Sequence, residues 1–147
     1  MKFTTILALL GAASAIKLRI RDDKDTSYLD LNNDYTEELQ TNGYTLVKGD
    51  KLEIDVDEDR SEDYKWWIKP WKDDFEDVAS LADDEHDCPD KDEKDAGVPC
   101  KRKFTLKGKD PGNGVFKITY EYREDHKDEA SDNIIQTYEF PLHVLDD

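Results

Sequence analysis

Hydrophobic and polar residues alternate along several short stretches of the chain, and such alternation is typical of half-buried β-strands. Residues 51–56 show it clearly, with Leu52, Ile54 and Val56 as the apolar positions. The other stretches with this pattern are 44–47, 64–68, 103–106, 115–122 and 137–144. The pattern predicts an all-β protein, a β-sandwich of about six to eight strands.

Two regions depart from plain alternation. Residues 70–100 predict a long, acidic and irregular loop, which in a compact domain is either functional or poorly ordered. Within it Phe75, Val78 and Leu81 are spaced by three, which favours a helical turn that anchors the loop to the core. Pro141 interrupts the last strand, and because proline has no backbone N–H, we expect it at an edge or a bulge.

The N-terminus predicts a signal peptide over residues 1–15. Lys2 supplies the positive start, residues 6–10 the apolar run, and residues 13–15 an A-x-A cleavage signal. The alternative is a buried N-terminal strand or helix. With a signal peptide the mature chain begins near Ile16 and enters the secretory pathway, to be secreted or delivered to a lysosome or vacuole lumen. An acidic N-terminal extension, 16–40, then precedes the domain proper, 41–147.

Charge limits the choice of partner. The formal net charge is −16, from 37 acidic and 21 basic residues. Nucleic acid and anionic membranes would be repelled, so we expect neither as a partner. A basic protein surface or divalent cations would be attracted, although many of these carboxylates serve solubility. No later apolar run approaches the length that spans a membrane, and we expect a monomer.

No enzyme motif stands out in the sequence. G-x-S-x-G, H-E-x-x-H and P-loop patterns are absent, and His86, His126 and His143 lie in different segments. We therefore expect neither enzymatic activity nor a cofactor. The chain has two cysteines, and in an oxidising compartment Cys88 and Cys100 are expected to form one disulfide.

Calcium is a weaker possibility. Residues 55–59 carry acids at the odd positions of an EF-hand loop. The pattern then fails, because Arg60 stands where glycine is needed and Trp66 where a bidentate glutamate is needed. We expect no specific metal site, although residues 83–95 are acidic enough to bind calcium weakly.

The strand framework resembles that of the chagasin-like inhibitors of papain-type cysteine proteases. The resemblance covers about residues 41–145. It rests on Gly43-Tyr44-Thr45-Leu46, Gly49 to Ile54, the aromatic-x-Trp of Tyr64-Lys65-Trp66, Phe104-Thr105-Leu106, Gly114, Ile118-Thr119-Tyr120 and Tyr138 to Val144. It implies an immunoglobulin-like sandwich whose three loops, at one end, wedge into a protease cleft and occlude its nucleophilic cysteine.

The loops differ from the family pattern. The family carries Asn-Pro-Thr-Thr-Gly, a Gly-rich segment, and Arg-Pro-Trp or Arg-Pro-Phe; this chain has residues 59–63, 96–100 and 122–124 in their places. The resemblance implies protease contacts by Arg60, Ser61, Glu62, Asp63, Tyr64, Trp66, Gly97, Val98, Tyr122 and Arg123. A disulfide between Cys88 and Cys100 would brace the middle loop.

The resemblance implies a secreted inhibitor of papain-like cysteine endopeptidases, with the protease as its protein partner. The alternative is a non-inhibitory, acidic binding module on the same sandwich, which binds another protein or calcium. A weaker third reading is an acidic structural protein of secretory granules that calcium condenses.

Overall fold

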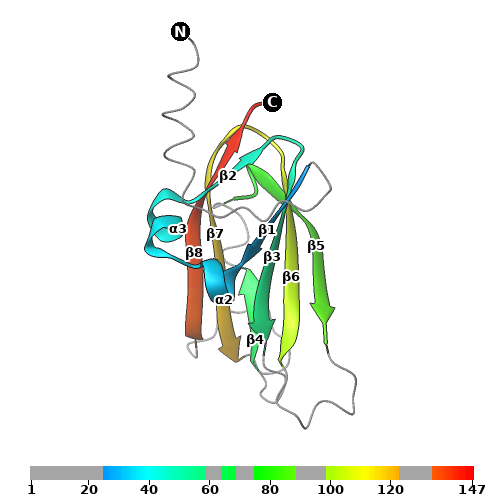
Figure 1. Cartoon of the computed structure of the whole chain (residues 1–147), viewed down its shortest axis with the longest axis vertical. Coiled ribbons are helices and arrows are strands. Elements are labelled where there is room, and N and C mark those ends of the chain that lie inside the picture. The colour runs from blue at the N-terminus through cyan, green and yellow to red at the C-terminus, as the bar shows by residue number, and fades with distance from the viewer. Residues whose placement is uncertain (1–24, 59–63, 69–74, 89–98, 123–133) are drawn as a thin grey trace.

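The computed structural model describes residues 25–58, 64–68, 75–88, 99–122 and 134–147, and the structural statements below concern these residues. They form two four-stranded sheets (Figure 1). The first sheet has the order β1 (Thr26–Asp30), β3 (Lys51–Glu58), β6 (Cys100–Gly108) and β5 (Ala79–Asp87). The second has the order β2 (Tyr44–Val47), β8 (Ile134–Leu145), β7 (Gly112–Tyr122) and β4 (Tyr64–Ile68).

The core lies between the inward faces of these sheets. Leu52, Ile54 and Val56 of β3 are fully buried, as the alternation predicts. From the other sheet Phe116 of β7 packs against Phe104 of β6, with ring centroids 6.3 Å apart. Burial of these apolar faces drives the two sheets together. The predicted all-β sandwich is confirmed, with strands at each of the six predicted stretches.

The prediction of one long irregular loop over residues 70–100 is wrong for the part that the structure describes. Its described part contains β5, which pairs antiparallel with β6 along its length. β5 is an edge strand whose residues after Ala79 are exposed, so neither face needs an apolar stripe and the alternation is missing. Phe75 and Val78 are buried in a turn, as expected, whereas Leu81 lies in β5 and is 40% exposed.

The described residues before position 41 belong to the sandwich, although the sequence predicts an extension there. β1 pairs in parallel with β3, and two short helices follow, α2 (Leu31–Asp34) and α3 (Glu37–Asn42). The Asp30 side chain caps α2, and the Thr36 side chain caps α3. Leu29 of β1, Leu31 of α2 and Leu39 of α3 are at most 1% exposed, so these elements pack against the core. Among the described helices none is long and apolar enough to cross a membrane.

Pro141 lies in β8, an interior strand, yet its missing N–H breaks no ladder bond. The Tyr35 hydroxyl bonds both backbone groups of Glu139, on the side of β8 away from β7. Backbone groups two residues apart point the same way, so the Pro141 nitrogen faces that side too. The β2 ladder begins one residue later, at Leu142. Pro141 therefore occupies a local edge, as the sequence predicts.

Gly43 provides a test of the close contact between the end of α3 and Pro141 of β8. It has φ 73° and ψ −166°, a region that is essentially restricted to glycine. A Cβ there would lie 2.1 Å from the Pro141 carbonyl oxygen, whereas at Gly49 (φ 93°) a Cβ would meet nothing within 4 Å. We predict that Gly49→Ala costs about 1–3 kcal/mol of strain, and that Gly43→Ala costs clearly more. Urea denaturation measures both, and equal losses would contradict the close contact with Pro141.

Candidate functional site

Three connections leave the sandwich at the same end. Strand register places Glu58 opposite Cys100 and Tyr64 opposite Tyr122, and the last pair of β7 and β8 joins Glu121 to Ile134. These strand ends, together with Cys88, are called the loop-bearing end; it is the lower end in Figure 1. The connections β3–β4, β5–β6 and β7–β8 all begin and finish there, and the C-terminus lies at the other end.

The loops themselves, 59–63, 89–98 and 123–133, lie outside the described residues. Seven of the ten predicted contact residues fall in them: Arg60, Ser61, Glu62, Asp63, Gly97, Val98 and Arg123. Tyr64, Trp66 and Tyr122 are described, and the structure brings these three together at the loop-bearing end. The described residues hold these loops at their ends.

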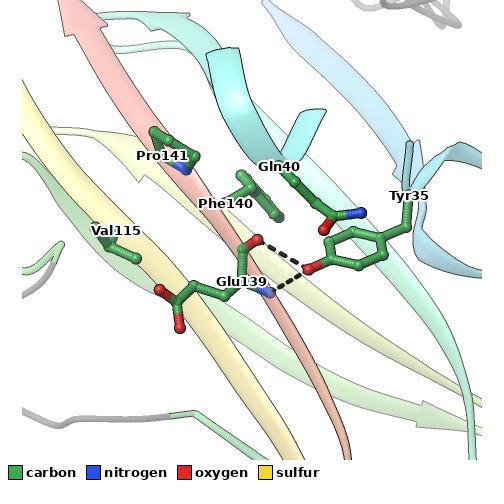
Figure 2. Close-up of a pocket in the computed structure, with 6 residues that line it drawn as sticks. All are labelled: Tyr35, Gln40, Val115, Glu139, Phe140 and Pro141. Carbon is green, nitrogen blue, oxygen red and sulfur yellow. Dashed lines mark hydrogen bonds between the residues drawn. The ribbon is translucent and has the colours of Figure 1, made fainter. Parts of the chain in front are cut away.

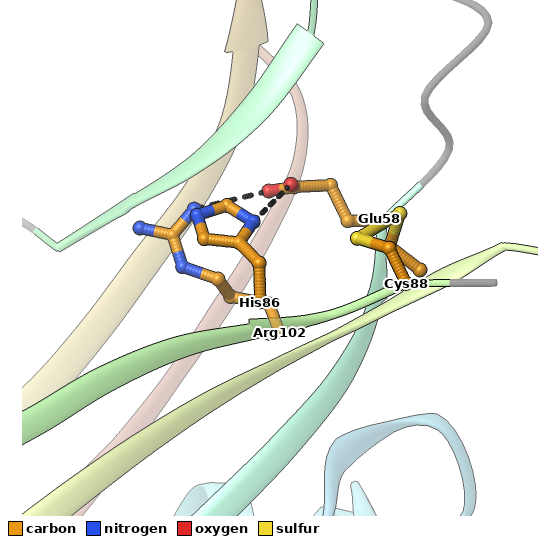
Figure 3. Close-up of a disulfide and its surroundings, with 5 residues drawn as sticks. Glu58, His86, Cys88 and Arg102 are labelled. Carbon is orange, nitrogen blue, oxygen red and sulfur yellow. Dashed lines mark hydrogen bonds and ion pairs between the residues drawn. A yellow bond between two sulfur atoms is a disulfide. The ribbon is translucent and has the colours of Figure 1, made fainter. Parts of the chain in front are cut away.

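A buried carboxylate, Glu58, forms the centre of the loop-bearing end (Figure 3). Its Oε2 accepts hydrogen bonds from the Trp66 backbone N–H (3.0 Å) and from Arg102 Nη1 (3.3 Å). His86 Nδ1 lies 3.2 Å from Oε1. Arg102 also forms two hydrogen bonds to Asp84, one of them 2.7 Å from Nη2 to Oδ2. Glu58 is 3% exposed, so these partners offset the cost of burying its carboxylate.

Glu58 is absent from the predicted site, although the sequence carries a signal for it. The inward positions of β3 continue as Leu52, Ile54, Val56 and Glu58, so the alternation places a carboxylate in the core. Because Glu58 adjoins an acidic stretch, the sequence favours a loop at this position. The structure shows instead that it is the last inward residue of the strand.

Trp66 ties β4 to the end of β3. Its indole Nε1 donates to the Asp57 carbonyl (2.8 Å), and its backbone N–H donates to Glu58. β4 is an edge strand, so the Glu58 carboxylate takes the place of a neighbouring strand for that N–H. Trp66 is 2% exposed and faces the core. Trp66 therefore fixes β4 to the end of β3, where the first loop begins.

A row of aromatic rings continues from this tryptophan. The Tyr64 ring lies 5.7 Å from both Tyr122 and Tyr120, measured between centroids. Trp66 lies 4.9 Å from Tyr120 and 5.2 Å from Tyr138. Burial raises the pKa of Tyr138, so its hydroxyl remains protonated through the physiological range. Tyr64 and Tyr122 are half-buried, so each combines packing with an accessible edge.

The disulfide expected between Cys88 and Cys100 is present, with Cα atoms 4.3 Å apart (Figure 3). Cys100 is 1% exposed and begins β6 opposite Glu58. The bond closes the connection between β5 and β6 directly beside the Glu58 network. In the chain-entropy account, closing such a loop stabilises the fold by about 2–3 kcal/mol.

The described residues provide no ready-made metal centre. No group of three or more histidine, cysteine or acidic side chains among them is arranged to hold a metal ion. Asp55, the first acid of the failed EF-hand pattern, is buried in β3 and accepts a hydrogen bond from the Tyr28 hydroxyl. Asp57 instead pairs with Lys101 (3.2 Å), and this hydrogen bond raises the pKa of the lysine.

A pocket of about 350 Å³ lies away from this end (Figure 2). Tyr35 and Gln40 line one side of it, and Val115 and residues 139–141 line the other. The Tyr35 hydroxyl is already bonded to both backbone groups of Glu139. These two hydrogen bonds join Tyr35, which ends α2, to β8, so they hold the fold together, and the loop-bearing end remains the candidate site.

A two-sheet sandwich with three connections gathered at one end defines the class of the protein as an immunoglobulin-like binding domain. The family model "Chagasin family peptidase inhibitor I42" matches residues 45–140, and the chain belongs to that family. The resemblance seen in the sequence is thereby confirmed. The family consists of peptidase inhibitors and not of enzymes, so the fold is that of a cysteine protease inhibitor.

Solved structures show the same fold. The crystal structure of the cysteine protease inhibitor EhICP2 from Entamoeba histolytica aligns with a TM-score of 0.58 at 19% identity, covering 82% of this chain and 96% of that one. The solution structure of Amebosin aligns with a TM-score of 0.50 at 18% identity, covering 82% and 98%. No curated protein sequence matches the chain.

The Glu58 network can be tested by removing its central carboxylate. Glu58→Ala leaves Arg102 without one of its two carboxylates and the Trp66 N–H without its acceptor, so we predict a loss of about 3 kcal/mol in urea denaturation. Asp57→Ala is the matched control, because the Asp57–Lys101 pair is about half exposed and worth less than about 1 kcal/mol. Similar losses for the two variants would refute a central role for Glu58.

Proposed function

We propose that the protein is a secreted, reversible inhibitor of papain-like cysteine endopeptidases that blocks the active-site cleft with its three loops. The observation that supports this most strongly is the convergence of the three connections at one end of a chagasin-family sandwich. In this proposal residues 60–64 form the central contact. Gly97 and Val98 flank it on one side, and Tyr122 and Arg123 flank it on the other.

The anchoring of the loop ends favours tight binding. A loop that is ordered only on association loses conformational entropy, and this loss weakens the complex. Here the first loop leaves β3 at Glu58, which is bonded to Trp66 of the following strand, β4, and the middle loop is closed by a disulfide. The loop ends are thus held before a partner arrives, which lowers the entropic cost of docking.

The charge of the chain selects among targets. A net charge of −16 attracts a basic protease surface and accelerates association at low salt. The same charge penalises carboxylates that become buried unpaired in the cleft. A signal peptide over residues 1–15 would bring the inhibitor to the secretory pathway, where the disulfide can form.

The direct test is a titration of papain and of a cathepsin L-type protease with the purified mature protein, its disulfide intact. We expect reversible loss of peptidase activity at stoichiometric inhibitor, competitive with a peptide substrate. Full activity at micromolar inhibitor, with a β-rich spectrum proving that the protein is folded, would reject the proposal for these targets. The non-inhibitory binding module would then be the better description.

The role of the first loop can be separated from the effect of charge. We predict that replacing Glu62 and Asp63 with alanine changes the inhibition constant at least about tenfold, because residues desolvated in an interface commonly account for more than 1 kcal/mol. Replacing Asp146 and Asp147 with alanine removes the same charge at the opposite end and should change mainly the association rate. Equal inhibition constants for the two double variants would argue against entry of this loop into the cleft.

A further inference from the structure

Two adjacent isoleucines stand exposed at the loop-bearing end. Ile134 is 44% exposed and Ile135 is 59% exposed, at the start of β8, where the chain enters the sheet after the third loop. We name this pair the isoleucine patch. Exposed apolar side chains scattered singly on a surface need no explanation, whereas these two are consecutive residues at the end that carries the loops.

The backbone gives the patch a defined position. β7 and β8 pair Tyr120 with Gln136 and Glu121 with Ile134, so Ile135 is the extra residue of a β-bulge. Bulges are common beside functional sites, where they redirect a side chain. The surroundings of the patch are fixed, since Gln136 Nε2, next in the strand, bonds the Tyr138 hydroxyl (2.8 Å), and Glu121, opposite Ile134 on β7, is fully buried. The patch is therefore displayed from an ordered strand.

We propose that the isoleucine patch contacts an apolar area of the target peptidase beside its active-site cleft, and so adds a specificity contact outside the three loops. This inference rests on the proposed function. Its support is continuity, because the patch directly follows the third loop at the end that would face the enzyme. A second copy of the chain is the competing occupant, but two molecules of net charge −16 repel each other.

The strand itself provides a matched control. Leu145 is 53% exposed at the far end of β8, away from the loops. Threonine keeps the β-branching of isoleucine while replacing its ethyl group by a hydroxyl, and β-branched residues suit a strand at Leu145 too, so Ile135→Thr and Leu145→Thr should both fold. Thermal unfolding of both variants, compared with the wild type, verifies this before inhibition is measured.

The measurement is the inhibition constant of wild type, Ile135→Thr, Ile134→Thr/Ile135→Thr and Leu145→Thr against a papain-like peptidase that the wild type inhibits. We expect a roughly tenfold weaker constant for Ile135→Thr, a larger loss for the double variant, and no change for Leu145→Thr. Because an apolar contact is not screened, the ratio of variant to wild type should be the same at low and high salt.

Each alternative has its own outcome. Unchanged constants for both isoleucine variants, with an inhibiting wild type, would overturn the patch and leave the proposed function intact. Self-association of the wild type in sedimentation that Ile135→Thr abolishes, with inhibition unchanged, would assign the patch to a second copy. A folded wild type that inhibits no papain-like peptidase would overturn the proposed function and this inference together.

Discussion

The loop-bearing end depends on the buried carboxylate of Glu58. A carboxylate that is 3% exposed is costly unless its charge is compensated, and Arg102, the Trp66 N–H and His86 supply that compensation. These partners come from β6, β4 and β5, while Glu58 itself ends β3. One anionic group therefore positions the strand ends that bound the first two loops, and its hydrogen bond to Trp66 links the two sheets at the loop-bearing end.

Backbone pairing and aromatic packing, not ion pairs, hold the strands that bound the third loop. Its strands, β7 and β8, are joined by ladder pairing and by aromatic packing around Tyr120 and Tyr138, with a bulge at Ile135. Salt screens an ion-pair network where it is exposed, whereas a packed aromatic row responds little to salt. The three loops thus share one end of the sandwich, but the Glu58 network holds the ends of the first, this network and the disulfide those of the second, and apolar contact those of the third.

The sequence predicts those elements whose burial is one-sided. Alternation identifies β2, β3, β4, β6, β7 and β8, each with an inward apolar face. It misses β5 because both faces of that edge strand are exposed to solvent, and it misses β1 because its two apolar residues, Tyr28 and Leu29, are adjacent and do not alternate with polar residues. Glu58 is missed for the opposite reason, since an acidic residue at an inward position reads as the start of a loop. The loop residues come from family resemblance, and the cysteine pairing follows from there being two cysteines.

The division between framework and loops explains how the family fold persists in this chain. At 19% identity to EhICP2 few individual side chains are shared, yet the sandwich is retained, because alternation and strand pairing need only apolar residues of suitable size. Glu58, Trp66 and the disulfide lie in or next to strands and constrain the ends of the loops, not their side chains. The sequence of a loop can then change while its end-to-end geometry stays the same. Loop chemistry that departs from the family pattern is therefore compatible with a retained mode of presentation, and specificity can move to flanking residues such as Ile134 and Ile135.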